Sequence, residues 1–175
     1  MARQSIVLGG GCFWCMEGVF SLVKGVMQAV SGYAGGELDN PSYEQVCSGT
    51  TGHAEVVSVE YDDSTVSLHD ILEIFFAVHD PTSLNGQGAD TGTQYRSVVY
   101  CYDDAQKQIV LDAIATIKKH YSRKIVTEVS LLDEFYKAEE YHQHYFKRNP
   151  NQGYCQTVIA PKIEKFRNHF KDKLQ

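Results

Sequence analysis

The chain has 175 residues, 43% of them hydrophobic, which is enough for a sizeable core and favours a single domain over residues 1–175. Its formal net charge of −6 argues against nucleic-acid binding, because such proteins carry a basic patch or stripe. We find no signal peptide and no run of about 20 apolar residues that could span a bilayer, so we expect a soluble, cytoplasmic monomer without a membrane partner.

The first third of the chain predicts two strands around a helix. Residues 5–8 form an apolar run that stops at three glycines, and apolar residues then recur at helical spacing from residue 13 to residue 23. Residues 26–33 predict the second strand, and the Gly/Asn/Pro-rich residues 35–41 predict a loop. This pattern places Cys12 at the start of the first helix.

The middle of the chain predicts a half-buried strand followed by a capped helix. In residues 53–61 the apolar Val57, Val59 and Tyr61 alternate, and Glu55 shares their face. Ser67, with Asp70 three residues later, resembles a capping box at the start of a helix that ends near residue 80.

The remaining elements alternate irregularly. After a glycine-rich loop, 83–93, we expect strands at 95–102 and 124–132 and helices at 103–121, 134–147 and from Pro161 onward. Such an order favours an α+β two-layer sandwich with a mixed β-sheet over a doubly wound fold. We therefore expect a ferredoxin-like core with the C-terminal segment wrapped around it.

Cys12 is a candidate nucleophile. A cysteine at a helix start meets unpaired N–H groups and the positive end of the helix dipole, which favour the thiolate. Phe13 and Trp14, the only tryptophan, follow it and could form an apolar wall for a substrate methyl group. The alternative is that Cys12 is a small core residue and that Phe13 packs in the core.

Glu55 is a candidate proton donor. A carboxyl group on the apolar side of a strand has its pKa raised by desolvation, so it can hold a proton near neutral pH. A solvated glutamate at a strand end is the alternative. Tyr43, Asp90 and Tyr95 lie in or beside the glycine-rich loops, where functional residues are often found.

The five cysteines are an odd number, which indicates reactive or buried thiols rather than a structural disulfide set. Cys12 and Cys15 form a Cys-x-x-Cys pair that could close a disulfide. Cys47 and Cys101 are interpreted as loop and strand residues without chemistry.

Four segments together resemble the A-type peptide methionine sulfoxide reductases, in order and spacing over almost the whole chain. They are Gly10-Gly11-Cys12-Phe13-Trp14-Cys15, Gly52-His53-Ala54-Glu55, Gly92-Thr93-Gln94-Tyr95-Arg96-Ser97 and Asn149-Pro150-Asn151-Gln152-Gly153-Tyr154-Cys155. The resemblance implies reduction of the S epimer of methionine sulfoxide, free or in oxidised proteins, with thioredoxin or another dithiol as electron donor and no cofactor.

The resemblance also implies roles for individual residues. Cys12 would be the nucleophile and Glu55 the acid that protonates the sulfoxide oxygen. The substrate pocket would comprise Phe13, Trp14, Tyr43, Asp90, Tyr95 and His142. A sulfenic acid on Cys12 would be resolved by Cys155, with Cys15 as the alternative resolver, since Cys15 stands where other family members have glycine.

Three other functions remain open at this point. A zinc module would use the Cys-x-x-Cys pair and some of the seven histidines, although no second pair follows. A thioredoxin-like oxidoreductase also places Cys-x-x-Cys at a helix start. A noncatalytic binding domain would use the eleven tyrosines as an interface.

Overall fold

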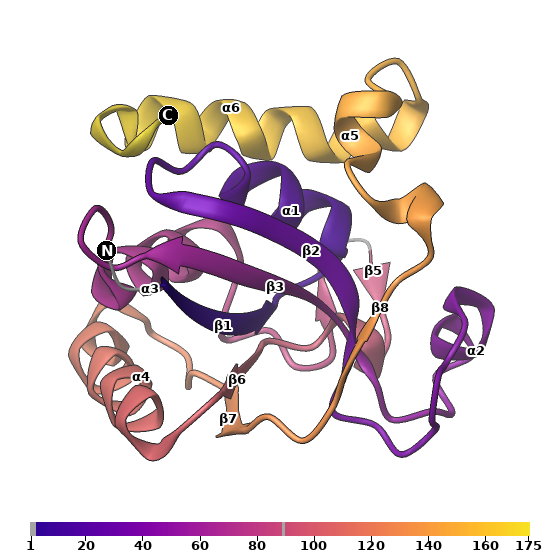
Figure 1. Ribbon diagram of the computed structural model, residues 1–175, viewed down its shortest axis with the longest axis horizontal. Helices are drawn as coiled ribbons and strands as arrows, with labels where there is room; N and C mark the ends of the chain where they lie inside the picture. The colour runs from indigo at the N-terminus through magenta and orange to yellow at the C-terminus, as the bar shows by residue number, and fades with distance from the viewer. Residues whose placement is uncertain (1–2, 89) are drawn as a thin grey trace.

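The computed structural model describes residues 3–88 and 90–175, and within them a mixed sheet of six strands carries the fold (Figure 1). The strand order is β7-β6-β1-β3-β2-β8, and every neighbouring pair is antiparallel except β6 and β7. The strands are β1 (Arg3–Gly9), β2 (Val26–Ala34), β3 (Ala54–Asp62), β6 (Val98–Cys101), β7 (Glu128–Leu131) and β8 (Phe135–Lys137). A separate two-stranded ribbon joins β4 (Gly86–Gln87) to β5 (Asp90–Thr91).

The sheet is strongly curled. β7 and β8 lie at its two opposite edges, yet only residues 132–134 connect them. Such a link spans at most about 14 Å, whereas six strands in a flat sheet extend over about 24 Å. The two edges must therefore bend toward each other, and Figure 1 shows the chain passing from β7 to β8 across the lower side of the molecule.

The longer helices cover one face of the sheet. They are α1 (Phe13–Phe20), α3 (Leu68–Val78), α4 (Asp104–Ile117) and α6 (Ala160–His169), with α2 (Tyr43–Cys47) and α5 (Tyr145–Arg148) as short additions. The larger core cluster joins Leu8 and Val59 of the sheet to helix residues such as Phe20, Phe75 and Ile163. A smaller cluster on the other face is covered partly by Leu132 and Phe135. None of the helices in the described ranges is long and apolar enough to cross a membrane.

The predicted α+β class, with helices layered on a mixed sheet, is confirmed. Four central strands stand in the antiparallel order β6-β1-β3-β2 and are connected through α1 and α3. β7 and β8 extend both edges, and the ferredoxin-like description of the core stays a prediction. The Ser67 capping box is present, since Ser67 and Asp70 exchange side-chain to backbone hydrogen bonds.

The predicted helix over 134–147 is wrong. This segment forms β8, the 3₁₀ turn η3 (Glu140–His142) and α5. Its first residues pair with the free edge of β2, where Gly32 leaves room for the Phe135 ring. His144 then adopts a left-handed φ of 56°, which no helix interior tolerates. Tertiary pairing has overridden the local helical pattern.

Other boundaries also differ from the sequence pattern. The strand predicted at 95–102 is preceded by the 3₁₀ turn η1 (Thr93–Tyr95) and begins only at Val98. The helix predicted to begin at Pro161 is extended backward by a π-helical turn, η4 (Cys155–Ile159). Two further 3₁₀ turns are η2 (Lys118–His120) and η5 (Lys171–Lys173). These differences bring the C-terminal third against α1.

Candidate active site

Cys12 is the N-cap residue of α1, as predicted, and only 7% of its surface is exposed. The turn before it depends on glycine, because Gly11 has a φ of 91°. A side chain at Gly10 would meet the His79 ring and Met16 at under 3 Å. The Gly11 N–H donates to the Tyr95 carbonyl at 3.2 Å, which fixes the turn to η1. The thiol is therefore held in a narrow, rigid setting.

The helix start favours the Cys12 thiolate, as expected, but burial of the sulfur opposes ionisation more strongly. Burial raises the pKa of Cys12 well above its ordinary value, and the Glu55 carboxylate raises it further. The Trp14 N–H and the Tyr154 hydroxyl lower this pKa, in the direction expected of a helix start, but their effect is smaller. Desolvation of the sulfur therefore raises the pKa of Cys12 more than the helix terminus lowers it.

Glu55 has the properties predicted from its position in the strand. It is 1% exposed, and burial raises its pKa to about 8. One carboxyl oxygen, Oε1, accepts the Phe13 N–H at 3.2 Å. The other, Oε2, is buried without a partner among the described residues. A protonated Glu55 therefore has one oxygen anchored beside Cys12 and one free to donate.

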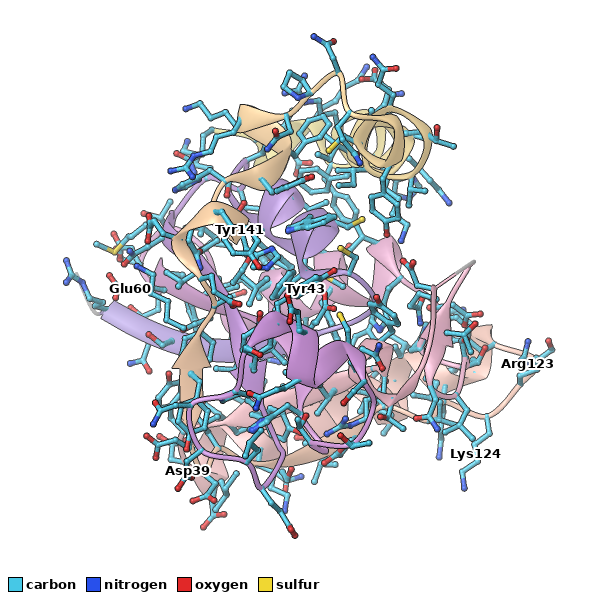
Figure 2. The ribbon with its side chains drawn as sticks, turned by 90° about the vertical axis from the view of Figure 1, so that its right-hand side faces the viewer. Asp39, Tyr43, Glu60, Arg123, Lys124 and Tyr141 are labelled. Atoms are coloured by element: carbon cyan, nitrogen blue, oxygen red, sulfur yellow. The ribbon has the colours of Figure 1, made fainter. Side chains whose placement is uncertain are left out.

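An aromatic cluster surrounds Trp14. The Trp14 ring stacks on Tyr145 with centroids 3.8 Å apart and an interplanar angle of 8°. The ring centroids of Phe13 and Tyr43 are 6.3 Å apart in a stacked arrangement, and those of Tyr43 and His142 are 4.3 Å apart. Phe13 and Trp14 thus contribute to both the core and an apolar wall beside Cys12. Figure 2 shows Tyr43 near the centre of this side of the molecule and Tyr141 above it.

His142 is buried in η3 and orients the indole of Trp14. Trp14 Nε1 can only donate, and it donates to His142 Nδ1 at 3.1 Å. His142 Nδ1 is therefore unprotonated, and in the neutral ring the hydrogen lies on Nε2. Nε2 is buried with no partner among the described residues. Burial also lowers the pKa of His142, which favours this neutral tautomer.

Glu139 organises the tyrosines behind this cluster. Its two carboxylate oxygens accept hydrogen bonds from the Tyr33 hydroxyl at 2.8 Å and the Tyr43 backbone N–H at 2.9 Å. Burial opposes ionisation of Glu139, but these hydrogen bonds outweigh it and lower its pKa. The carboxylate therefore connects α2, which carries Tyr43, to β2 and to the turn that carries His142.

Asp90 and Tyr95 reach the site from the loop region between α3 and β6. Asp90 Oδ2 accepts the Tyr154 hydroxyl at 2.6 Å, and Tyr154 makes an edge contact with Trp14. Tyr95 is half-buried, and its pKa is raised by burial first and then by Glu55. The Tyr43 hydroxyl has the Cys47 sulfur, a weak acceptor, as its neighbour. Both tyrosines therefore offer hydroxyls that a ligand can engage.

The five cysteines are all free. Cys15 is buried in the first turn of α1, and burial raises its pKa to about 11. Cys155 is completely buried at the start of η4, where its N–H donates to the Gln152 side chain at 3.1 Å. Cys47 is exposed and Cys101 is buried in β6. Within residues 3–88 and 90–175, no group of three or more His, Cys, Asp or Glu side chains is arranged to hold a metal ion.

The structure adds Tyr145, Tyr154 and Glu139 to the predicted residues. Each contacts a residue far away in the sequence, and for the two tyrosines that residue is Trp14. Tyr154 stands in the Gly-Tyr-Cys segment that the sequence singled out, but with eleven tyrosines in the chain that signal was weak. Glu139 has no sequence motif that would mark it.

Comparisons with known proteins agree over nearly the whole chain. A family model described as peptide methionine sulfoxide reductase matches residues 4–174. The peptide methionine sulfoxide reductase MsrA of a Nitratiruptor species is 52% identical over 172 residues, which cover 98% of this chain and 99% of the relative.

Solved structures show the same fold. Mxr1 from Saccharomyces cerevisiae in reduced form superposes with a TM-score of 0.84 at 36% identity, covering 87% of this chain and 89% of Mxr1. Mxr1 in complex with Trx2 gives a TM-score of 0.60 at 26% identity, covering 82% of this chain and 84% of that one.

Proposed function

Since the chain belongs to the peptide methionine sulfoxide reductase family, and is an oxidoreductase that reduces methionine sulfoxide, we propose that it acts on the S epimer through Cys12. The substrate is methionine sulfoxide in oxidised proteins or as the free amino acid. We also propose that residues 1–175 act as one domain, as a cytoplasmic monomer, and without a cofactor.

The first step transfers the sulfoxide oxygen to Cys12. The Cys12 thiolate attacks the electrophilic sulfur while protonated Glu55 gives its proton to the oxygen. The attack forms a bond between the two sulfurs, while the sulfur–oxygen bond of the substrate breaks and the protonated oxygen leaves as hydroxide. The hydroxide then bonds to the Cys12 sulfur, the sulfur–sulfur bond breaks, methionine leaves, and Cys12 becomes a sulfenic acid. The substrate is reduced by two electrons and Cys12 is oxidised by two.

The observation that carries this proposal is the Glu55 carboxyl group beside the Cys12 turn. Its pKa of about 8 keeps a proton on it at neutral pH, and its Oε2 has no other partner among the described residues. A buried, protonated carboxyl with a free oxygen is suited to donate to a sulfoxide oxygen. The hydroxyls of Tyr43 and Tyr95 and the Nε2–H of His142 are further donors, and Phe13 and Trp14 would receive the methyl group.

The second step converts the sulfenic acid to a disulfide, with release of water, by attack of a second thiol. We propose Cys155 as this thiol, with Cys15 as the alternative. The effects of charge support a relay through both, since Cys15 acts on the pKa of Cys12 and Cys155 acts on the pKa of Cys15. η4, which begins at Cys155, packs against α1, which carries Cys15 in its first turn.

The third step returns both cysteines to thiols by exchange with an external dithiol, which becomes oxidised in turn. We propose thioredoxin for this role. The complex of Mxr1 with Trx2 supports it, because Mxr1 shares this fold over most of both chains.

The test is to incubate reduced protein with each epimer of a blocked methionine sulfoxide and to count methionine formed and thiols lost. We expect reduction of the S epimer only, and none by Cys12→Ser. Cys155→Ser and Cys15→Ser should each complete one turnover, and the true resolver is the one whose loss leaves a trappable sulfenic acid. If Cys15 passes the oxidation to Cys155, only Cys15→Ser leaves the sulfenic acid trappable, and Cys155→Ser stops at a disulfide between Cys12 and Cys15.

A Glu55→Gln variant separates this enzyme from a thioredoxin-like oxidoreductase. It should lose sulfoxide reduction by at least about a hundredfold, the usual contribution of a general acid, while its thiols still exchange with disulfides. If neither epimer is reduced by the unmodified protein, the proposal fails and the thioredoxin-like function takes its place.

A further inference from the structure

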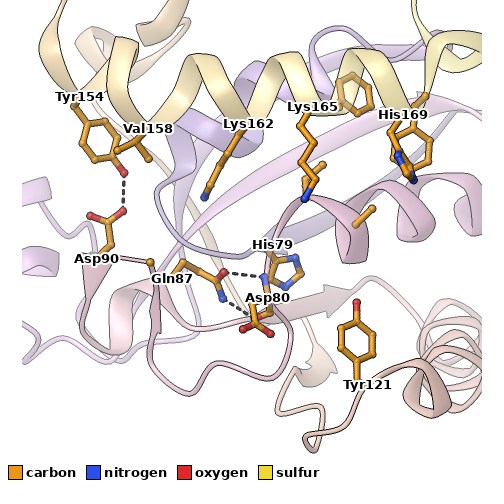
Figure 3. Close-up of a pocket in the computed structure, with 15 residues that line it drawn as sticks. His79, Asp80, Gln87, Asp90, Tyr121, Tyr154, Val158, Lys162, Lys165 and His169 are labelled. Carbon is orange, nitrogen blue, oxygen red and sulfur yellow. Dashed lines mark hydrogen bonds between the residues drawn. The ribbon is translucent and has the colours of Figure 1, made fainter.

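A cavity lies beside the aromatic cluster rather than within it. It has a volume of about 580 Å³ and runs between the C-terminal end of α3, residues Gln87, Gly88 and Asp90, η4 and α6. Figure 3 shows Tyr154 and Asp90 at one end of it and His169 at the other. Tyr154 also makes an edge contact with Trp14, so the cavity adjoins the proposed active site and shares Tyr154 and Asp90 with it.

Two lysines of α6 face this cavity. Lys162 and Lys165 are one helical turn apart, and Figure 3 shows both side chains pointing from α6 toward the opposite wall. Neither forms an ion pair with any of the described residues. In a chain with a net charge of −6, two lysines that line a cavity without a carboxylate partner call for an explanation.

The carboxylates in the cavity wall are already engaged. Asp80 accepts hydrogen bonds from the Thr82 N–H and hydroxyl at 2.9 and 2.6 Å, and Asp90 accepts from Tyr154. Apolar side chains, including Val158 and Phe166, line much of the remaining wall. The cavity thus offers an apolar surface with two cations on the α6 side and two hydrogen-bonded carboxylates in its wall.

We propose that this cavity binds the polypeptide that flanks an oxidised methionine, and that Lys162 and Lys165 bind a carboxylate in that flank. The inference rests on the proposed function, which puts the methionine sulfoxide itself beside Cys12. Because the cavity and the proposed active site share Tyr154, a polypeptide whose methionine sulfoxide lies beside Cys12 can extend into the cavity. The two lysines would then favour acidic side chains in that polypeptide. The substrate class is therefore oxidised proteins with aspartate or glutamate near the methionine.

The geometry also sets the spacing. At a rise of 1.5 Å per residue, the distance along the helix axis is about 12 Å from Tyr154 to Lys162 and about 16 Å from Tyr154 to Lys165. An extended peptide advances about 3.3 Å per residue. The carboxylate should therefore lie about four or five residues from the methionine sulfoxide.

The test uses peptides of one length that contain a single methionine sulfoxide and a pair of Asp, Asn or Lys residues placed four and five positions away, on either side. For the unmodified protein we expect kcat/KM to be about fivefold higher with the Asp pair than with the Asn pair, on one side only, chiefly through KM. A pair placed at one and two positions should show no such preference. High salt should remove the preference, because exposed charges are screened.

Charge reversal provides the decisive variant. Lys162→Glu with Lys165→Glu should prefer the Lys peptide to the Asp peptide, and Lys162→Gln with Lys165→Gln should show no preference. The matched control, Lys118→Glu with Lys119→Glu, makes the same charge change on exposed residues outside the cavity and should keep the Asp preference.

Three results would overturn the inference. One is equal kcat/KM for the Asp and Asn peptides with the unmodified protein, and another is an Asp preference that survives charge reversal at the two lysines. The third is a change only in the KM for thioredoxin, which would assign the cavity to the reductant. Blocked methionine sulfoxide, which has no flank, reports separately on the proposed function, and failure to reduce it would remove the premise instead.

Discussion

At the scale of single residues, Cys12 and Glu55 are best treated as one titrating pair. At neutral pH the resting state, thiol with protonated carboxyl, holds two protons, and the reactive state, thiolate with protonated carboxyl, holds one. Burial raises both pKa values, and an ionised Glu55 raises that of Cys12 further. The protein therefore combines a protonated buried carboxyl with a thiol that is harder to ionise than usual, and Cys12 must lose its proton as it attacks the substrate.

Replacing Glu55 should make Cys12 more acidic. In Glu55→Gln the carboxylate charge is gone while an oxygen remains to accept the Phe13 N–H, so the pKa of Cys12 falls. We expect the pH midpoint of Cys12 alkylation, followed by mass spectrometry of the Cys12 peptide, to move down by about one unit. Cys47 is the internal comparison, because burial and the Tyr43 hydroxyl affect its pKa more than Glu55 does. The pH midpoint of Cys47 alkylation should therefore shift less. An unchanged Cys12 midpoint would contradict the coupling.

His142 should hold Trp14 in place. His142→Phe keeps an aromatic ring but removes the acceptor for the indole N–H, which leaves a part-buried donor unsatisfied. We expect KM for blocked methionine sulfoxide to rise about three- to tenfold, the effect of one lost hydrogen bond. Because Trp14 is the only tryptophan, its fluorescence reports the change directly. A spectrum and KM identical to those of the unmodified protein would remove His142 from this role.

At the scale of the elements, the sequence patterns located the site residues that depend on local structure and missed those that depend on pairing. Cys12 follows from a glycine turn before a helix, and Glu55 follows from alternation along β3. His142 lies where a helix was expected but a 3₁₀ turn occurs, because β8 pairs with the edge of β2. Periodicity does not report which edge of a sheet is vacant.

The glycine turn should be sensitive to added bulk. In Gly10→Ala the new methyl group would lie within 3 Å of the His79 ring and of Met16, so α1 and α3 must move apart. We expect a loss of about 1–3 kcal/mol of unfolding free energy, typical of overpacking, together with lower kcat/KM. Gly153→Ala is the matched control, because nothing lies within 4 Å of a methyl group there. Chemical denaturation of both variants provides the comparison, and equal stabilities would show that the turn can relax.

At the scale of the whole molecule, the fold class could be predicted but the closure of the sheet could not. Alternating strands and amphipathic helices indicate an α+β layered fold. The curl follows from a three-residue link between opposite edges, and it was hidden because the sequence predicted a helix where β8 occurs. The same segment carries Glu139 and Tyr145, which the sequence did not single out, so the error in the fold and these two missed residues have one origin.

The buried acid should also set how the stability of the whole protein depends on pH. The pKa of Glu55 is about 8 in the folded protein, above its value of about 4.3 in an unfolded chain, so folding retains a proton between these limits. Its contribution to stability is therefore fully present below about pH 4.3 and is lost as the pH rises through 8. Glu55→Gln cannot ionise, so its free energy of unfolding should gain, relative to the unmodified protein, on the order of 4 kcal/mol between pH 4 and pH 8.

Urea denaturation across this pH range would test that gain, with the exposed Glu164→Gln as the matched control. We expect the difference curve for Glu55→Gln to rise with pH and that for Glu164→Gln to stay flat. A flat curve for Glu55→Gln would mean that the carboxyl is ionised in the folded protein at neutral pH, and Glu55 could then no longer be the resident proton donor. If the difference curve for Glu55→Gln rises with pH and the variant has lost sulfoxide reduction, then the Glu55 carboxyl both lowers the stability of the folded protein at neutral pH and serves as the acid.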